Sequence, residues 1–375
     1  MYHLLRALIF RVSPERAHNA TIALLRLAGA VPPISAALRG MFWPGATAPA
    51  GTSADGLRPL PAPEVRVFGL TFANPVGLAA GYDKDGLGWR GLATLGFGHI
   101  EIGTVTPRPQ TGNAGTRVFR LVEDQAIINR MGFPNRGAAF VARRLQGPRP
   151  ACLILGVNIG KNKTTPLADA AQDYLTLIRT FAPLADYLTI NISSPNTPGL
   201  RSLQGRQALA ELLPPLVAER QAQRRQLGRR IPLLVKLAPD LTSDELDDAL
   251  EVILTTGLDG VVLSNTSYSR EGLRSPAGAE SGGLSGAPIR KRNTAIVRAV
   301  VQRTGGVLPV VASGGVMRPE DAAEKLEAGA ALIQLFTGLI YAGPTLVRDV
   351  LAHNWNYVSG RSPLHEQPVW VPEAA

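Results

Sequence analysis

From about residue 65 onward, short runs of apolar residues recur along the chain. The runs are NPVGLA near residue 76, HIEIGTV near 101, CLILGVNI near 155, YLTINI near 189, LLVKLA near 235, GVVLSN near 262, LPVVAS near 310 and ALIQLF near 333. Most of them lack alternation of apolar and polar positions, which is typical of parallel strands buried on both faces. Helical patterns separate them, most clearly SDELDDALEVILTTG and RPEDAAEKLEAGA, with acidic first turns and a glycine at the end.

Eight strand–helix units over roughly 290 residues predict an α/β fold, a (β/α)8 TIM barrel. A doubly wound open sheet is the alternative, because repeated units do not distinguish a closed sheet from an open one. The barrel is favoured because nearly every run ends in a polar residue, and only a closed sheet gathers these ends at one mouth. The polar ends are Lys84, Thr104, Asn158, Asn191, Lys236, Ser264–Asn265, Ser313–Gly314–Gly315 and Thr337.

The first 42 residues have a different pattern, which predicts two short amphipathic helices. Ser13 and Pro14 separate them and are suited to cap and begin the second helix. Five arginines against one glutamate give this segment a net charge of about +4. A basic helix pair with an apolar face can lie in a membrane interface. Packing of that face against the main domain is the other interpretation.

The composition divides the chain into four segments. We expect an N-terminal helical region at residues 1–42, a Pro/Gly-rich linker at 43–64, the barrel at 65–355 and a tail at 356–375.

The net charge of +10 favours anionic partners such as phosphate groups or an anionic membrane surface. Nucleic acid is not expected, because the basic residues are scattered and few aromatic residues interleave with them. The one cysteine, Cys152, excludes an internal disulfide framework and a cysteine-rich metal site. No stretch is suited to span a bilayer, and we expect neither a secretion signal nor an obligate protein partner.

The predicted mouth combines cations, amides and a glycine-rich loop. Lys84 and Lys236 can stabilise developing negative charge in an enclosed place. A lysine inside an apolar strand is a strong indication of function, because burying an unpaired ammonium group is expensive. Four asparagines offer donors and acceptors to a planar ligand: Asn158, Asn191, Asn196 and Asn265. The loops after the last two strands are where barrels often bind phosphate, so the mouth suits a phosphate-bearing cofactor and a planar, amide-like substrate.

These features leave three functions open. One is an enzyme that holds a phosphate-bearing cofactor and a planar, amide-like substrate. A phosphosugar isomerase or Schiff-base lyase with Lys236 as the working group is the second. The third is a non-catalytic module that binds a membrane surface.

Several longer motifs occur in order at the strand ends: AAGYDKD, EIGTVTPRPQ, INRMGFPN, VNIGKNK, NISSPNTPGLR and GGLSG. With them the chain resembles the dihydroorotate dehydrogenases, in particular their membrane-associated, quinone-reducing class 2. The resemblance runs from about residue 2 to 352, apart from the linker. It implies a flavoprotein that holds FMN in a barrel and oxidises dihydroorotate to orotate in de novo pyrimidine (UMP) biosynthesis, with a membrane quinone as the final acceptor.

The resemblance gives Ser194 the role of catalytic base. It implies that Ser194 takes a proton from carbon 5 of dihydroorotate while a hydride leaves carbon 6 for the flavin N5. A serine hydroxyl is a weak base, and the resemblance implies help from Lys84, ordered water and a cationic pocket. The other class has cysteine at this position, so serine together with the N-terminal helices indicates the quinone class.

The same matching implies the ligand sets. The substrate set is Lys84, Asn129, Arg130, Met131, Gly132, Phe133, Asn191, Asn196, Asn265 and Thr266. The cofactor set is Ala80, Gly81, Lys84, Thr104, Asn158, Asn191, Lys236, Ser264, Gly286, Gly315, Phe336 and Thr337. Lys236 is expected near the N1–O2 edge of the flavin, where reduction builds negative charge. Gly314 and Gly315 are expected to let the phosphate approach the backbone.

His18 and Arg120 are the expected quinone contacts, with a helix-surface histidine as the alternative for His18. The resemblance also implies a peripheral membrane protein on the cytoplasmic face of a bacterial inner membrane. The chain departs from many relatives at Phe336, where they have tyrosine, at Pro134, where they have asparagine, and at Ser264, where they have threonine.

Overall fold

The computed structural model describes residues 2–42 and 64–359. The expected linker, apart from residue 64, and the expected tail beyond residue 359 lie outside the described residues. The last described helix, α12 (Leu346–Ser359), continues past the expected end of the barrel at residue 355.

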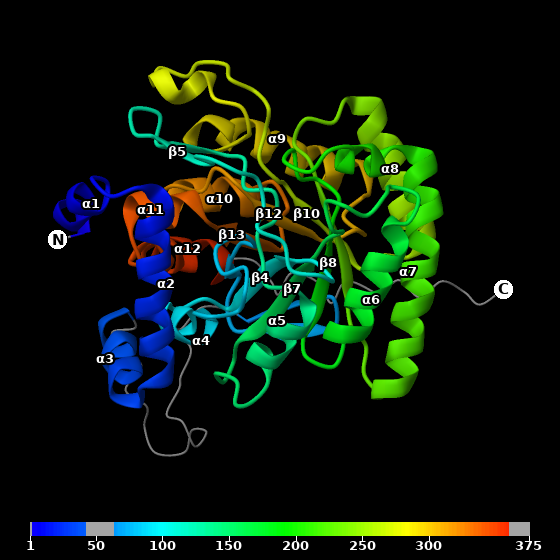
Figure 1. Ribbon diagram of the computed structural model, residues 1–375, viewed down its shortest axis with the longest axis horizontal. Coiled ribbons are helices and arrows are strands. Elements are labelled where there is room, and N and C mark those ends of the chain that lie inside the picture. The colour runs from blue at the N-terminus through cyan, green and yellow to red at the C-terminus, as the bar shows by residue number, and fades with distance from the viewer. Residues whose placement is uncertain (1, 43–63, 360–375) are drawn as a thin grey trace.

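The eight apolar runs form the strands of one closed parallel barrel, in chain order (Figure 1). The strands are β3 (Val76–Leu78), β4 (His99–Val105), β7 (Ile154–Ile159), β8 (Tyr187–Asn191), β9 (Leu233–Leu237), β10 (Gly260–Leu263), β12 (Val310–Ser313) and β13 (Leu332–Leu335). Pairing of β13 with β3 closes the ring, with Leu335 opposite Leu78. The prediction of a barrel is therefore confirmed, and the open sheet is excluded.

Helices follow most strands and cover the outside of the barrel (Figure 1). The principal ones are α5 (Ala138–Leu145), α6 (Ala170–Phe181), α7 (Arg206–Leu227), α8 (Ser243–Thr256), α9 (Arg290–Arg303), α10 (Pro319–Glu327) and α12, with the shorter α4 (Trp89–Leu92) and α11 (Thr337–Ala342). Single 3-10 turns are η1 (Ala93–Leu95), η2 (Leu200–Gln204), η3 (Pro276–Ala279) and η4 (Ala287–Ile289). At α8, Thr242 and Glu245 form the reciprocal capping box that fixes the start of the helix.

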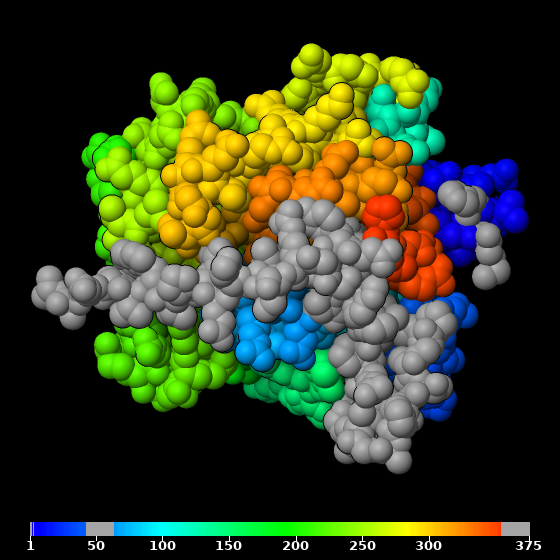
Figure 2. Space-filling model, turned by 180° about the vertical axis from the view of Figure 1, so that it is seen from behind, coloured from blue at the N-terminus to red at the C-terminus, as the bar shows by residue number. Residues whose placement is uncertain are grey.

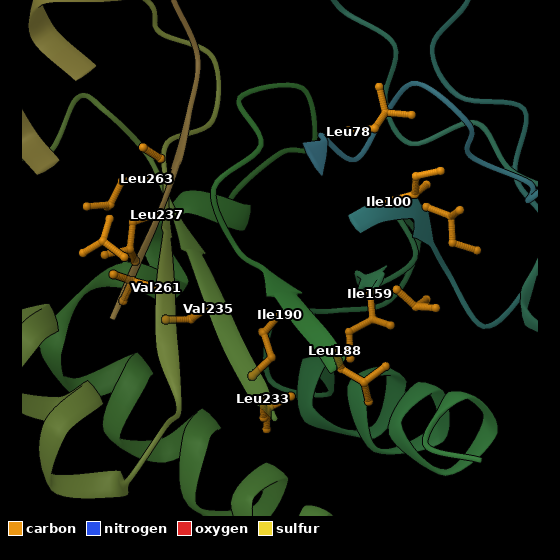
Figure 3. Packing of buried hydrophobic residues seen from close by; sticks show 14 of the residues in the cluster. Leu78, Ile100, Ile159, Leu188, Ile190, Leu233, Val235, Leu237, Val261 and Leu263 are labelled. Atoms are coloured by element: carbon orange, nitrogen blue, oxygen red, sulfur yellow. The ribbon is translucent and has the colours of Figure 1, made fainter. Parts of the chain in front are cut away.

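The hydrophobic core lies between the strands and these helices. Figure 3 shows apolar side chains of neighbouring strands, among them Leu188 and Ile190 of β8 and Val235 of β9. Helix residues such as Leu177 of α6 and Leu213 of α7 belong to the same buried cluster. The helices therefore hold the strand ends in fixed relative positions.

Two smaller sheets are additions that the apolar runs did not predict. A hairpin of β1 (Val65–Val67) and β2 (Leu70–Phe72) precedes the first barrel strand. An antiparallel sheet of β5 (Val118–Leu121), β6 (Ala126–Asn129) and β11 (Gly283–Gly286) joins segments that are far apart in the sequence.

The N-terminal region contains three helices where two were expected: α1 (Tyr2–Ile9), α2 (Pro14–Ala30) and α3 (Pro32–Phe42). Helix α2 packs closely on α4, where a Cβ on Gly91 would lie 2.0 Å from the carbonyl oxygen of Leu25. Tyr2 donates its hydroxyl proton to the carbonyl oxygen of Ile340 at 2.7 Å. The view from behind shows the N-terminal segment beside the C-terminal helices (Figure 2).

Both interpretations of the apolar face apply to parts of this region. Ile22 and Phe42 are buried in the main core, whereas Leu4 and Leu24 are 78% and 68% exposed. Among the described helices, none alone is long and apolar enough to cross a membrane. Helices α2 and α3 together have the length and apolar composition of a membrane span, but they are bent by 108° from one another.

Gly77 of β3 is required by the histidine opposite it. His99 of β4 is fully buried, and burial lowers the pKa of its imidazole to about 3, so the ring is neutral. A Cβ on Gly77 would lie 2.0 Å from Nε2 of His99. The ring therefore occupies the space that a side chain at position 77 would need.

We expect Gly77→Ala to lower the free energy of unfolding by about 1–3 kcal/mol, because the packed imidazole must move. Urea denaturation measures this. Gly40→Ala is the matched control, because a Cβ there meets nothing within 4 Å and alanine is the better helix former. Equal unfolding midpoints for Gly77→Ala and the unchanged protein would contradict the packing described here.

Candidate active site

A large cavity of about 1500 Å3 opens at the carboxyl ends of the barrel strands. It extends from Tyr2 and His18 of the N-terminal helices to Lys236 and Ser264 at the strand ends. Pockets for one drug-sized ligand are usually about 300–1000 Å3. The cavity therefore has room for more than one small molecule at a time.

Thr104, Asn158 and Asn191 form a hydrogen-bonded layer at the floor of the cavity. The hydroxyl of Thr104 donates to Oδ1 of Asn158 at 2.6 Å. Nδ2 of Asn191 donates to Oγ1 of Thr104 at 2.9 Å and to Oδ1 of Asn158 at 3.0 Å. Because each group fixes the orientation of the next, Thr104 and Asn191 present a defined pattern of donors and acceptors to the cavity.

Glu101 of β4 lies under this layer and is fully buried. Its carboxylate accepts hydrogen bonds from Asn158 Nδ2 at 2.8 Å, Tyr187 Oη at 3.1 Å, Thr189 Oγ1 at 3.2 Å and Gln334 Nε2 at 3.0 Å. A buried carboxylate needs such donors, since an isolated buried charge is very costly.

Lys236 of β9 points into the cavity above this carboxylate and is 5% exposed. Burial lowers the pKa of its ammonium group, and the charge of Glu101 acts in the opposite direction. Gln334 also lines the cavity, and its buried Oε1 has no hydrogen-bond partner among the described residues. The cavity thus offers a buried lysine and an unpartnered amide oxygen, which suit a polar planar ring that can receive negative charge.

The loop after β12 has the geometry of an anion cradle. Gly314 and Gly315 both line the cavity and have φ values of +103° and +72°. A Cβ on Gly315 would lie 2.4 Å from Cα of Arg290. Only glycine fits this turn, so the loop presents its backbone to the cavity, as phosphate-binding loops do.

Ser194 lies in the loop after β8, is 4% exposed and lines the same cavity. Its Oγ accepts a hydrogen bond from the backbone N–H of Asn196 at 3.2 Å. Nδ2 of Asn196 donates in turn to Oδ1 of Asn129 at 3.2 Å. Among the described lining residues the one histidine is His18, which belongs to α2. Ser194 therefore sits among amides, without the histidine partner of a hydrolase triad.

Lys84 follows β3 and supplies the second cation of the cavity. Its Nζ donates to the carbonyl oxygen of Gly81 at 2.8 Å. Burial lowers the pKa of this lysine to about 8, while the charge of Asp85 opposes the shift. Lys84 is therefore mainly cationic at pH 7 and is suited to bind an anionic group.

A partly exposed ion pair connects the N-terminal helices to the barrel near Lys84. Arg117 donates to Glu15 of α2 through Nε and Nη2, each at 3.0 Å. Both residues line the cavity. The pair holds the start of α2 over the loop that precedes β5.

Most of the residues expected from the sequence meet at this cavity. It is lined by Ser194, Lys84, Asn129, Met131, Gly132, Phe133, Asn191, Asn196, Asn265 and Thr266, and by Ala80, Gly81, Thr104, Lys236, Ser264, Gly315, Phe336, Thr337, His18 and Arg120.

Three expected residues do not line the cavity: Arg130, Asn158 and Gly286. Arg130 pairs with Glu280 at 2.6 Å, and its guanidinium lies 4.6 Å from the ring centroid of Phe119. Its neighbours on either side, Asn129 and Met131, line the cavity, so the alternation of an extended chain directs the side chain of Arg130 away from it. Asn158 lies behind the cavity wall and orients Thr104 and Asn191 through the hydrogen-bonded layer.

Aromatic rings lead from α2 to the barrel mouth. The ring centroids of His18 and Tyr82 are 5.2 Å apart, and those of Tyr82 and Phe336 are 5.6 Å apart. Burial, and then the charge of Lys84, lower the pKa of His18 to about 4, so the imidazole is neutral at pH 7. Arg120 lies nearby, 4.5 Å over the ring of Phe10.

Sequence reasoning missed Glu101, Gln334 and Tyr82. Glu101 and Gln334 each interrupt an apolar strand run, which is the signal that singled out Lys236. Tyr82 lies inside the AAGYDKD motif, but nothing in the local pattern separates a cavity aromatic from a core aromatic.

The chain is similar to known proteins over nearly all of its length. Residues 63–353 match the family model described as dihydroorotate dehydrogenase. The chain belongs to the dihydroorotate dehydrogenase family. The resemblance drawn from the motifs is therefore confirmed, and family membership implies a flavin cofactor.

Individual relatives agree with this assignment. The "dihydroorotate dehydrogenase (quinone)" of Azotobacter vinelandii is 47% identical over 352 residues, which are 94% of this chain and 96% of the relative. A protein of the same name from Anaeromyxobacter dehalogenans is 49% identical, over 93% of this chain and 90% of the relative. Among solved structures, the Eimeria tenella dihydroorotate dehydrogenase in complex with ferulenol is 37% identical, with a TM-score of 0.78 and 92% of each chain covered.

Proposed function

We propose that this dihydroorotate dehydrogenase oxidises (S)-dihydroorotate to orotate with FMN as hydride acceptor and a membrane quinone as final electron acceptor, in the de novo synthesis of UMP. One observation carries the proposal. A single cavity contains Ser194, Lys84 and Lys236 and continues to His18 of the N-terminal helices. The name of the relatives, dihydroorotate dehydrogenase (quinone), supports the same substrate and acceptor.

Ser194 acts as the general base in this proposal. It takes the proton from carbon 5 of dihydroorotate, which is acidified by the adjacent carbonyl group, and its own hydroxyl proton passes to water. Asn129 and Asn196, which are hydrogen-bonded to each other beside Ser194, orient the amide edge of the substrate. Lys84, with its pKa of about 8, counters the negative charge of the substrate carboxylate. It also counters the negative charge that develops at carbon 5 as the proton leaves.

FMN, when bound, supplies the chemistry of accepting a hydride from carbon 6. Lys236 would hold the ring at the edge where negative charge develops, supported by Glu101 below it. Gly314 and Gly315, with Thr337, would hold the phosphate. Phe336 would pack against the flavin ring. The phenyl ring lies close to Gly81, where a Cβ would come within 3.3 Å of it.

The N-terminal end of the cavity is the proposed quinone site. Tyr2, Leu5 and Ile9 make it more apolar than the barrel mouth. Neutral His18 and the guanidinium of Arg120 are the polar contacts available there. Phe336 replaces a hydroxyl that many relatives have, so a hydrogen bond from that position is absent from the proposed contacts.

Peripheral attachment to the cytoplasmic face of a bacterial inner membrane completes the proposal. Leu4, Leu8 and Leu24 are exposed on α1 and α2, and arginines of the same helices would face anionic lipid. A quinone dissolved in the bilayer would then enter the cavity between these helices.

Ser194→Ala tests the base. We expect the rate of flavin bleaching by dihydroorotate to fall by at least about 100-fold, because a general base contributes that much or more. Binding of orotate is expected to survive. Stopped-flow absorbance under anaerobic conditions measures the rate, and Ser202→Ala, an exposed serine in η2, is the matched control. Bleaching of Ser194→Ala at the wild-type rate would rule out this role.

His18→Ala tests the quinone site. We expect slower reoxidation of the bleached enzyme by quinone and unchanged bleaching by dihydroorotate, because His18 lies at the N-terminal end of the cavity. The two half-reactions are measured separately in the stopped-flow instrument, and His353→Ala, at an exposed position of α12, is the control. The assignment is wrong if reoxidation is unaffected, or if both half-reactions slow equally.

A further inference from the structure

The carbonyl groups on both sides of Ser194 are held by side chains from other parts of the chain. The carbonyl oxygen of Ser193 accepts a hydrogen bond from Nε of Arg201 at 2.9 Å. The carbonyl oxygen of Pro195 accepts one from the hydroxyl of Tyr268 at 3.2 Å. The Ser193–Ser194 and Pro195–Asn196 peptides on either side of Ser194 therefore have fixed partners.

Arg201 connects three of the loops at the barrel mouth. Besides Ser193 after β8, it donates through Nη2 to the carbonyl oxygen of Thr266 after β10, at 2.7 Å. Through Nη1 it donates to Oδ2 of Asp240 after β9, at 2.8 Å. Its side chain and that of Asp240 are 17% and 18% exposed, so water competes little for these charge-assisted bonds.

Asp240 and Tyr268 complete the same unit. The guanidinium of Arg201 lies 4.2 Å from the ring centroid of Tyr268. Asp240 accepts from the hydroxyl of Ser267 at 2.5 Å and from the backbone N–H of Tyr268 at 3.1 Å. The carboxylate thus orients both the arginine and the loop from which the tyrosine reaches back to Pro195.

We propose that Arg201, with Tyr268 stacked on it, is the positioning residue for the catalytic base Ser194. Arg201 does not line the cavity, so it acts through the loop and not on the substrate. It fixes the Ser193–Ser194 peptide, and Tyr268 fixes the Pro195–Asn196 peptide, one residue beyond the base. This inference rests on the proposed function, because it requires Ser194 to be the base.

The planar fork of arginine is what the arrangement needs. Three acceptors on three loops are bound by Nε, Nη1 and Nη2 in one plane. Lysine keeps the charge and can pair with Asp240, but its ammonium is a point donor and does not span all three acceptors. Arg201→Lys therefore keeps the positive charge beside Asp240. It loses hydrogen bonds to the carbonyl groups that hold the loop of Ser194.

The test is Arg201→Lys in the full-length flavin-loaded enzyme. We expect flavin bleaching by dihydroorotate to slow by about 100-fold, the typical effect of misplacing a catalytic group by about 1 Å. The deuterium isotope effect for dihydroorotate labelled at carbon 5 is expected to rise, because proton removal becomes more limiting. Orotate binding and flavin content are expected to survive, and the thermal midpoint is expected to fall only slightly, because lysine keeps the ion pair with Asp240. Tyr268→Phe, which loses one exposed hydrogen bond, should slow bleaching by about fivefold.

Arg206→Lys is the matched control, because Arg206 pairs with Asp248 and Glu251 on the surface and contacts no part of the site. Wild-type bleaching rates in Arg201→Lys would overturn the inference. It is also overturned if the rate falls only together with the thermal midpoint and flavin content, with the carbon-5 isotope effect unchanged. A wild-type enzyme that is not bleached would instead refute the proposed function, and the inference with it.

Discussion

Pairing of β13 with β3 is the contact on which the site depends, because it closes the sheet into a ring. Closure brings the end of β8, with Ser194 after it, opposite the ends of β3 and β13. In an open sheet of the same strands, Lys84 and Lys236 would lie at separate places along a row. Closure of the ring places both lysines in one cavity, and the surrounding helices maintain the dimensions of that cavity.

A closed ring also buries polar groups, and the barrel provides partners for most of them. Glu101 is satisfied by four neutral donors and lies beneath Lys236, so the cation at the cavity floor is balanced from below. Among the described residues, the buried polar atoms without a partner include both ring nitrogens of His99 and Oε1 of Gln334. The ring of His99 packs against Gly77, whereas Gln334 lines the cavity. Of these two residues, His99 therefore belongs to the packing of the barrel and Gln334 to the site.

The sequence predicted the barrel and most of the lining because both follow from strand ends. Continuous apolar runs identify buried parallel strands, and the residue after each run must lie at the mouth. The strands β5 and β6 were not predicted, because they belong to an antiparallel sheet outside the barrel and Arg120 interrupts the apolar run of β5. Helix α3 was not predicted, although Pro32 and Pro33 lie in its first turn, where proline is favoured.

Side-chain direction was the part that sequence could not supply. Arg130 was expected at the substrate with its neighbours, but it turns outward to Glu280. Arg201 stands in a recognised motif, yet its three acceptors come from loops after three different strands. Such contacts depend on how the loops meet in space, and no local pattern encodes that.

In the proposed function, the closed barrel holds one flavin between Ser194 and Lys236. An absorbance spectrum of the purified protein, recorded under anaerobic conditions before and after dihydroorotate is added, is the decisive measurement. We expect a yellow protein whose visible flavin bands disappear when dihydroorotate is added without an electron acceptor. A colourless protein, or flavin bands that dihydroorotate leaves unchanged, would contradict it.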